Sequence, residues 1–301
     1  MADNETVPRV EKEIIYEEEN PVLYETQDRV AYLTLNRPQY HNSQNAQMLY
    51  ALDDAFFKAV GDDDVKVIVL KGNGKHFTAG HDIGSPGRDF EVGRDDRRTM
   101  MYNHDNKPAA EKAFAREMEL YIGFCHRWRE APKPTIAQVH GGCIAGGLML
   151  AWVCDLIVAS DDAFFQDPVV QMGFPGVEYF AHPFELNVRQ AKEFLLLGER
   201  WSADRVLAAG MINKVVPRDE LDEAVNEMAQ KIAKQPRLAA LLTKQACNHI
   251  ENLQGKKTGM DGVFAMHHFA HAQNTLATGD YISGFDGKKM AASNKKKEQE
   301  D

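Results

Sequence analysis

The stretch that decides the fold is His140-Gly141-Gly142-Cys143-Ile144-Ala145-Gly146-Gly147-Leu148-Met149-Leu150-Ala151. It places four glycines among small and apolar residues, after the β-like run Thr135–Val139 and before a helical pattern that ends at Cys154-Asp155. Glycine lets the backbone turn tightly and lets another group approach it closely. A glycine turn that opens a helix leaves free N–H groups at the positive end of the helix dipole. Such groups can bind an anion, either a phosphate or the oxyanion of a reaction intermediate.

The common phosphate-binding motifs do not fit this stretch. It is not a P-loop, because no Gly-Lys-Ser/Thr follows the glycines. It is also a poor dinucleotide fingerprint, because the acidic residue Asp155 follows after only a few residues instead of about twenty. Taken alone, this stretch is either an anion-binding turn or a turn that serves only packing.

A second glycine turn precedes the first along the chain. The apolar strand Val67–Leu70 leads into Lys71-Gly72-Asn73-Gly74-Lys75-His76-Phe77-Thr78-Ala79-Gly80-His81-Asp82-Ile83-Gly84. Further upstream, Val30–Leu35 alternates like a strand and runs into Asn36-Arg37-Pro38. Asn42-Ser43-Gln44-Asn45 then precedes an amphipathic pattern that predicts a helix over Met48–Val60.

Together these motifs resemble the crotonase, or enoyl-CoA hydratase/isomerase, superfamily. Asn36-Arg37-Pro38, Ala79-Gly80-His81-Asp82 and the glycine turn before Asp155 carry the resemblance, and their order and spacing fit it. The later segments from Ala191 to Ala203 and from Gly210 to Pro217 extend it to roughly residues 22 to 290. The resemblance implies an α/β fold with a crotonase-like ββα spiral core and a C-terminal helical region.

Composition agrees with a globular enzyme. The chain has 301 residues, 44% of them hydrophobic, and no apolar run long enough to span a membrane. A formal charge of -10 argues against a nucleic-acid surface. We find no leader pattern, and the four cysteines show no paired metal-type spacing, so we expect a cytoplasmic protein with reduced thiols.

The chain divides into zones. We expect a flexible N-terminal arm over residues 1–20, the spiral core over 21–217, a C-terminal helical trimerisation region over 218–290 and a disordered tail over 291–301. An acidic helix start, Asp219–Val225, opens the third zone. Residues 85–130 form an insertion in the core; we favour a solvated segment, with a lid over an acyl pocket as the alternative.

By resemblance, the protein acts on an acyl-CoA thioester, with coenzyme A as part of the substrate and no permanently bound cofactor. Two backbone N–H groups hold the thioester oxygen as an enolate forms, and they correspond to those of His81 and Gly146. Each such donor typically stabilises the developing charge by a few kcal/mol. The family also implies a homotrimer or a hexamer made of two trimers.

Two residues depart from the family pattern. The glutamates that hydratases use as acid and base correspond here to Met149 and Val169, which cannot transfer protons. Ordinary hydration is therefore in doubt, because acid–base catalysis contributes about 10²–10⁴-fold. The segment Gly176–Pro183 replaces a glycine-rich loop, and other branches of the family recruit an acid there. Glu178 is our leading acid/base candidate, ahead of Tyr179, His182 and Asp167; the alternative is that Glu178 only caps a helix and packs.

The resemblance also places the coenzyme near the first two turns. The candidate binding residues are His41, Ser43, Lys75, Ala79, Gly80, Asp82, Ile83 and, from the C-terminal part, Lys288, with Lys289 beside it. We expect no metal site, because His267, His268 and His271 share one helical stretch without acidic partners at ligand spacing.

Three functions remain open at this point. The first is an enoyl-CoA hydratase/isomerase-type enzyme with unusual acid/base residues. The second is a decarboxylase or C–C lyase on a CoA thioester, because decarboxylation forms an enolate without a base. The third is a non-catalytic acyl-CoA binding protein.

Overall fold

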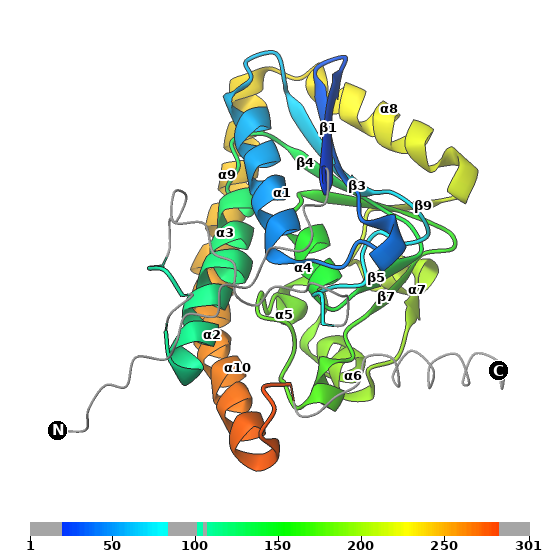
Figure 1. Cartoon of the computed structure of the whole chain (residues 1–301). Coiled ribbons are helices and arrows are strands. Elements are labelled where there is room, and N and C mark those ends of the chain that lie inside the picture. The colour runs from blue at the N-terminus through cyan, green and yellow to red at the C-terminus, as the bar shows by residue number, and fades with distance from the viewer. Residues whose placement is uncertain (1–19, 84–100, 105–106, 283–301) are drawn as a thin grey trace.

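The computed structural model describes residues 20–83, 101–104 and 107–282. Its main sheet has six strands in the order β1-β2-β3-β4-β6-β9 (Figure 1). These strands are β1 Val22–Gln27, β2 Val30–Leu35, β3 Val67–Gly72, β4 Thr135–Val139, β6 Leu156–Ser160 and β9 Lys214–Val216. β1 pairs antiparallel with β2, and every later pair in this sheet is parallel. The strands expected at Val30–Leu35, Val67–Leu70, Thr135–Val139 and Leu156–Ala159 are all present.

A second, three-stranded sheet has the order β5-β7-β8. Its strands are β5 Gly142–Ile144, β7 Phe164–Gln166 and β8 Trp201–Ser202. The chain leaves β4 of the main sheet, turns through the glycines into β5, and enters α4 (Gly146–Trp152) directly afterwards. The alternation between two sheets is the expected spiral, and it puts the glycine turn at the joint between them.

The helices cover both faces of the main sheet. They are α1 Ala46–Gly61, α2 Ala109–Glu117, the π-helix η3 Met118–Gly123, α3 Phe124–Arg129, α4 Gly146–Trp152, α5 His182–Glu185, α6 Val188–Leu197, α7 Ala203–Ala208, α8 Leu221–Ala233, α9 Arg237–Leu253 and α10 Lys256–Thr278, with 3-10 turns η1 Pro38–Tyr40, η4 Val169–Met172 and η5 Arg218–Glu220. The helix predicted over Met48–Val60 is α1, and it begins where the Asn45 side chain accepts the N–H of Met48 at 2.9 Å.

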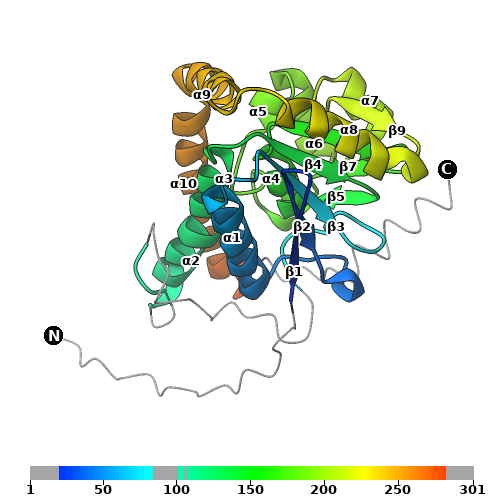
Figure 2. The same cartoon turned by 90° about the horizontal axis from the view of Figure 1, so that it is seen from above.

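Strand side chains alternate between two cores. Val67, Val69, Val158 and Val225 belong to a smaller apolar cluster between the sheet and α8 (Figure 2). The opposite face carries the larger cluster, which includes Leu33, Leu70, α1, α3 and α4. The main sheet is thus buried on both sides, as a parallel sheet requires.

The second half of the insertion, residues 109–129, is helical and partly buried, not solvated. α2, η3 and α3 follow one another over residues 109–129, and Glu117, Leu120, Tyr121 and Phe124 are buried. The prediction is wrong here because these residues recur at helical spacing and face the core. Figure 1 shows α2 alongside α10. Residues 84–100 and 105–106 lie outside the described chain, and so do most of the expected N-terminal arm and the whole C-terminal tail.

No helix among the described residues is long and apolar enough to cross a membrane.

Candidate active site

The two glycine turns lie against each other. Thr78 N–H donates to Gly142 C=O, and Ile144 N–H donates to Thr78 C=O, each at 3.1 Å. A Cβ on Gly80, whose φ is +90°, would lie 2.6 Å from Ile144 O and 3.1 Å from Gly146 N. Only glycine allows both this φ and this close approach.

The backbone N–H groups of His81 and Gly146 are available as donors. Gln44 N–H donates to Gly80 C=O at 2.7 Å, so the His81 N–H on the other side of that peptide points away from Gln44. Gly146 is the first residue of α4, where N–H groups have no partner within the helix. Among the described residues, neither N–H makes a hydrogen bond.

The His81 imidazole fills the space beside these donors. Its Nε2 lies 2.8 Å from Glu178 Oε2, and its ring stacks on Tyr121 at a centroid distance of 4.0 Å. A Cβ on Gly146 would lie 2.5 Å from His81 Cε1 and 2.7 Å from Nδ1. The Nδ1 edge of the ring therefore borders the Gly146 turn, and this Nδ1 is buried without a hydrogen-bond partner in the described chain.

Glu178 is a buried carboxylate with imidazole on two sides. Besides the bond to His81, its Oε1 lies 3.4 Å from His267 Nε2. Burial acts to raise the pKa of Glu178, but the charges of His81 and His267 outweigh it, so the pKa lies below its usual value. Glu178 is therefore ionised near neutral pH and can only accept a proton from the His81 ring or orient it.

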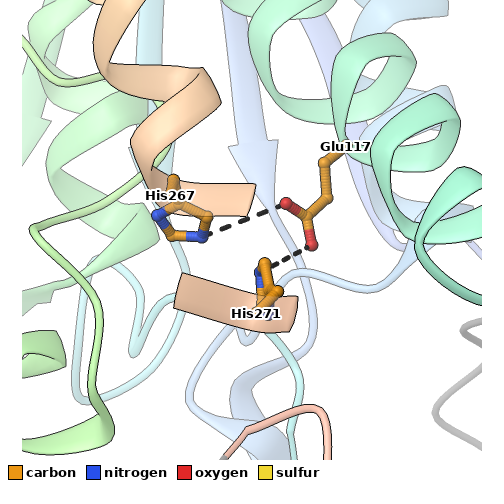
Figure 3. Close-up of side chains that lie close together, drawn as sticks. All are labelled: Glu117, His267 and His271. Carbon is orange, nitrogen blue, oxygen red and sulfur yellow. Dashed lines mark ion pairs between the residues drawn. The ribbon is translucent and has the colours of Figure 1, made fainter. Parts of the chain in front are cut away.

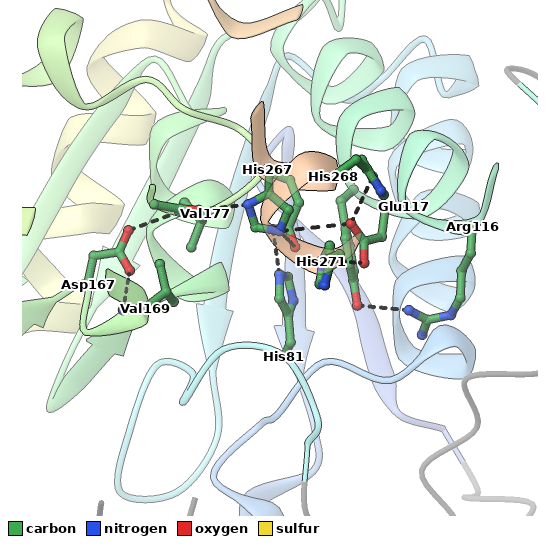
Figure 4. Close-up of polar contacts among 12 residues, drawn as sticks. His81, Arg116, Glu117, Asp167, Val169, Val177, His267, His268 and His271 are labelled. Carbon is green, nitrogen blue, oxygen red and sulfur yellow. Dashed lines mark hydrogen bonds and ion pairs between the residues drawn. The ribbon is translucent and has the colours of Figure 1, made fainter. Parts of the chain in front are cut away.

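A second buried carboxylate, Glu117 of α2, lies behind Glu178. Its Oε1 is 3.3 Å from His271 Nε2, and its Oε2 is 3.2 Å from His268 Nε2 and 4.0 Å from His267 Nε2 (Figures 3 and 4). Despite burial, these imidazoles hold the pKa of Glu117 well below its usual value. Glu117 in turn raises the pKa of His271, whereas burial lowers that of His267. The expectation that these histidines lack an acidic partner is wrong, because the partner comes from another segment of the chain.

Asp167 and Tyr179 lie in other surroundings. Asp167 is fully buried, and its carboxylate contacts His182 Nε2 at 2.8 Å. It also accepts the Val177 N–H at 3.2 Å (Figure 4). Asp167 and His182 thus brace the loop that carries Glu178. Tyr179 is also fully buried, and desolvation raises its pKa well above the usual value, with Arg129 partly opposing the shift. Within the described part of the chain, neither Asp167 nor Tyr179 makes a hydrogen bond or ring contact with His81.

The two residues expected at the hydratase glutamate positions are apolar and buried. Met149 lies in α4 and Val169 in η4, and both pack in the larger core cluster. Neither position can hold or transfer a proton.

The candidate coenzyme residues gather around the first turn. Ala79 N–H donates to His41 C=O at 2.9 Å, which ties the His41–Gln44 loop to the 79–83 segment. Asp82 is buried in an ion pair with Arg37 at 3.0 Å, so its side chain serves the fold. Lys75 is exposed beside this turn, whereas Lys288 lies outside the described residues.

The sequence analysis did not predict Glu117 or Tyr121 as site residues, and it gave His267 no role. Glu117 has a signal, because it shares a helical face with Leu120, Tyr121 and Phe124 at spacings of three, four and seven. A charged residue on an apolar helix face is a candidate for a buried site.

Comparisons with known proteins show the family to which this chain belongs. The Enoyl-CoA hydratase/isomerase family matches residues 25–289. The Mycobacterium tuberculosis protein EchA13, whose name includes the words enoyl-CoA hydratase, is 43% identical over 249 residues, which span 82% of this chain and 78% of that protein. The crystal structure of a probable enoyl-CoA hydratase from Mycobacterium smegmatis superposes with a TM-score of 0.79 at 41% identity, covering 88% of this chain and 99% of that one. The human mitochondrial Delta(3,5)-Delta(2,4)-dienoyl-CoA isomerase is 31% identical over 206 residues, 66% of this chain and 60% of that protein. The chain belongs to the enoyl-CoA hydratase/isomerase family and is an enzyme of the hydratase/isomerase kind.

Proposed function

We propose that this protein moves a proton on the acyl chain of a CoA thioester, as an enoyl-CoA isomerase does, rather than adding water. The thioester oxygen accepts hydrogen bonds from the N–H groups of His81 and Gly146, which stabilise the enolate. The single observation that carries the proposal is the 2.8 Å contact between Glu178 Oε2 and His81 Nε2, next to the Gly146 turn.

The pair works as one acid–base unit in this proposal. An ionised Glu178 accepts the Nε2–H of His81, so the neutral ring presents an Nδ1 lone pair towards the Gly146 turn. Nδ1 takes a proton from the acyl chain, Glu178 stabilises the imidazolium, and Nδ1 returns the proton at another carbon. One base suffices for such a shift, whereas hydration needs a water to be activated and a second proton to be placed. The apolar Met149 and Val169 agree with this choice.

The test is steady-state kinetics on a panel of 2-enoyl, 3-enoyl and dienoyl CoA esters. His81→Ala keeps the backbone donor and removes only the ring, and Glu178→Gln keeps the size and removes the charge. Each should lower the isomerisation rate by about 10²–10⁴-fold. Glu193→Gln is the control, because Glu193 is half exposed and pairs with Arg205 on the surface. A parent enzyme that isomerises at the same rate after Glu178→Gln contradicts the assignment.

Decarboxylation is the second candidate. It needs an oxyanion hole and no base, so the loss of the two glutamates would not disable it. Malonyl-type CoA esters in the same panel distinguish the two, because CO₂ release that survives Glu178→Gln favours decarboxylation. Binding of every ester with conversion of none favours an acyl-CoA binding protein.

We also propose that the chain assembles as a trimer or as a hexamer of two trimers. The C-terminal helices support this, since α9 and α10 leave Leu242, Leu253, Phe269 and Leu276 more than half exposed. Large apolar side chains left exposed on helices are available for a contact between subunits.

A further inference from the structure

The histidine cluster behind Glu178 directs two imidazole nitrogens at one buried carboxylate. His267 Nδ1 lies 3.0 Å from Gly176 O, and His271 Nδ1 lies 3.1 Å from Tyr281 O. A carbonyl oxygen only accepts, so each Nδ1 carries the ring's hydrogen. In the neutral rings both Nε2 atoms are therefore lone pairs.

Both lone pairs face the same carboxylate. His271 Nε2 lies 3.3 Å from Glu117 Oε1, and His267 Nε2 lies 4.0 Å from Glu117 Oε2 (Figure 3). A carboxylate also only accepts, so three acceptors converge on one buried space. Glu117 Oε2 and His271 Nε2 have no aligned hydrogen bond among the described residues. A positive charge between these atoms, carried by a bound metal ion or by a proton on an imidazole, turns their mutual repulsion into attraction.

We propose that Glu117, His267 and His271 bind a divalent transition-metal ion of the zinc class. Two imidazole nitrogens and one carboxylate oxygen are a ligand set that Zn²⁺, Co²⁺ and Fe²⁺ take in proteins. The three ligand atoms lie within 4.8 Å of one another. Metal–ligand bonds of about 2.0–2.2 Å put tetrahedral ligands roughly 3.3–3.5 Å apart, so the ligand atoms must close by up to about 1.5 Å when the ion binds.

The groups around the three proposed ligands already hold them in place. Backbone carbonyl groups hold both Nδ1 atoms, and the Tyr281 hydroxyl donates to Glu117 Oε1. Such partners fix the ring tautomer and orientation in metal sites. The His267 ring also stacks on Phe174 at 4.8 Å, and the His271 ring stacks on Tyr281 at 3.7 Å.

A way in and a fourth position are both present. A cavity of about 300 Å³, lined by Arg116, Glu117 and Tyr281 among others, reaches the cluster from the α2 side. It can admit a hydrated ion and leave a water as the fourth ligand. On the other side, Glu178 lies 3.4 Å from His267, so the ion would add positive charge next to the proposed acid–base pair.

The test is binding of Zn²⁺ and Co²⁺ to the full chain after removal of any histidine tag and treatment with a chelator. Isothermal titration should show one Zn²⁺ per chain, and Co²⁺ should give the visible absorption of a four-coordinate nitrogen and oxygen site. His271→Gln and His267→Gln should each weaken Zn²⁺ binding by at least about 10–100-fold, which is the loss caused even by removing a group that only hydrogen-bonds to a ligand. His249→Gln is the control, because His249 is exposed on α9.

Circular dichroism of each variant checks that it is folded. If a ligand variant fails to fold, the Co²⁺ spectrum of the parent decides, since a six-coordinate aqueous spectrum contradicts the proposal. No heat of Zn²⁺ binding to a folded parent, or binding that His271→Gln and His267→Gln leave unchanged, would overturn it. Activity is not the readout, so this result is independent of the proposed proton transfer.

Discussion

Gly146→Ala is the substitution for which the structure gives the clearest magnitude. The added methyl group keeps the N–H donor and lies 2.5 Å from His81 Cε1 and 2.7 Å from Nδ1. Carbon atoms in contact are about 3.5–4.0 Å apart, so the imidazole must retreat by about 1 Å or more. It cannot slide towards Glu178 at 2.8 Å, nor through the Tyr121 ring at 4.0 Å. The His81–Glu178 contact must therefore be lost or distorted.

A misplacement of about 1 Å costs roughly 10²-fold in rate. We expect that loss in kcat for the best CoA ester of the panel. Overpacking costs about 1–3 kcal/mol of the free energy of unfolding, and alanine in a helix returns up to about 1 kcal/mol. The stability loss is thus small, and urea denaturation should show a folded variant. Gly262→Ala on α10 is the control, because among the described residues no atom lies within 4 Å of its added methyl group. A Gly146→Ala variant with the parent's kcat would refute the placement of the His81 ring.

Four further predictions use other parts of the chain. Gly146→Pro removes the N–H donor as well as adding bulk, and kcat should fall by at least about 10²–10³-fold, the cost of one oxyanion donor. Asp167→Asn should lower the free energy of unfolding by about 1–3 kcal/mol in urea, because the buried imidazole of His182 loses its carboxylate partner, while the folded fraction keeps its turnover. The pKa of His76 is lowered from 6.5 to about 4, chiefly by burial and then by His41 and Lys75, so the unfolded chain binds a proton that the folded chain does not; stability should fall as the pH drops from 6.5 towards 4, and His76→Gln should flatten that slope in urea midpoints. Light scattering should give the mass of a trimer or a hexamer, and a monodisperse monomer would contradict the proposed assembly.

The sequence predicted the core strands because their apolar runs are continuous and bounded by glycine turns. The family resemblance led to Met149 and Val169 at the positions of the two glutamates and to Glu178 as a replacement acid, and these assignments stay predictions. The structure adds the contact of Glu178 with His81, which joins residues 97 positions apart.

Glu117 could not be assigned to the histidines from sequence. It comes from α2, whereas His267 and His271 come from α10, and only tertiary packing brings these helices together. Ligand spacing within one helix detects pairs such as His267 and His271, but a carboxylate from another helix leaves no local pattern. The prediction of a solvated insertion was wrong because the charged residues of its first half dominated its overall composition. The apolar face of residues 109–129 is evident only when that segment is considered separately as a helix.

Hydrogen–deuterium exchange at the carbon next to the thioester tests the central claim most directly. A saturated substrate such as butanoyl-CoA cannot be hydrated or isomerised, so deuterium from D₂O enters at that carbon only through an enolate. NMR should show exchange catalysed by the parent, and Glu178→Gln and His81→Ala should each slow it by about 10²–10⁴-fold, while Glu193→Gln leaves it unchanged. No exchange with the parent while butanoyl-CoA binds, or exchange that Glu178→Gln and His81→Ala leave at the parent's rate, would contradict the account.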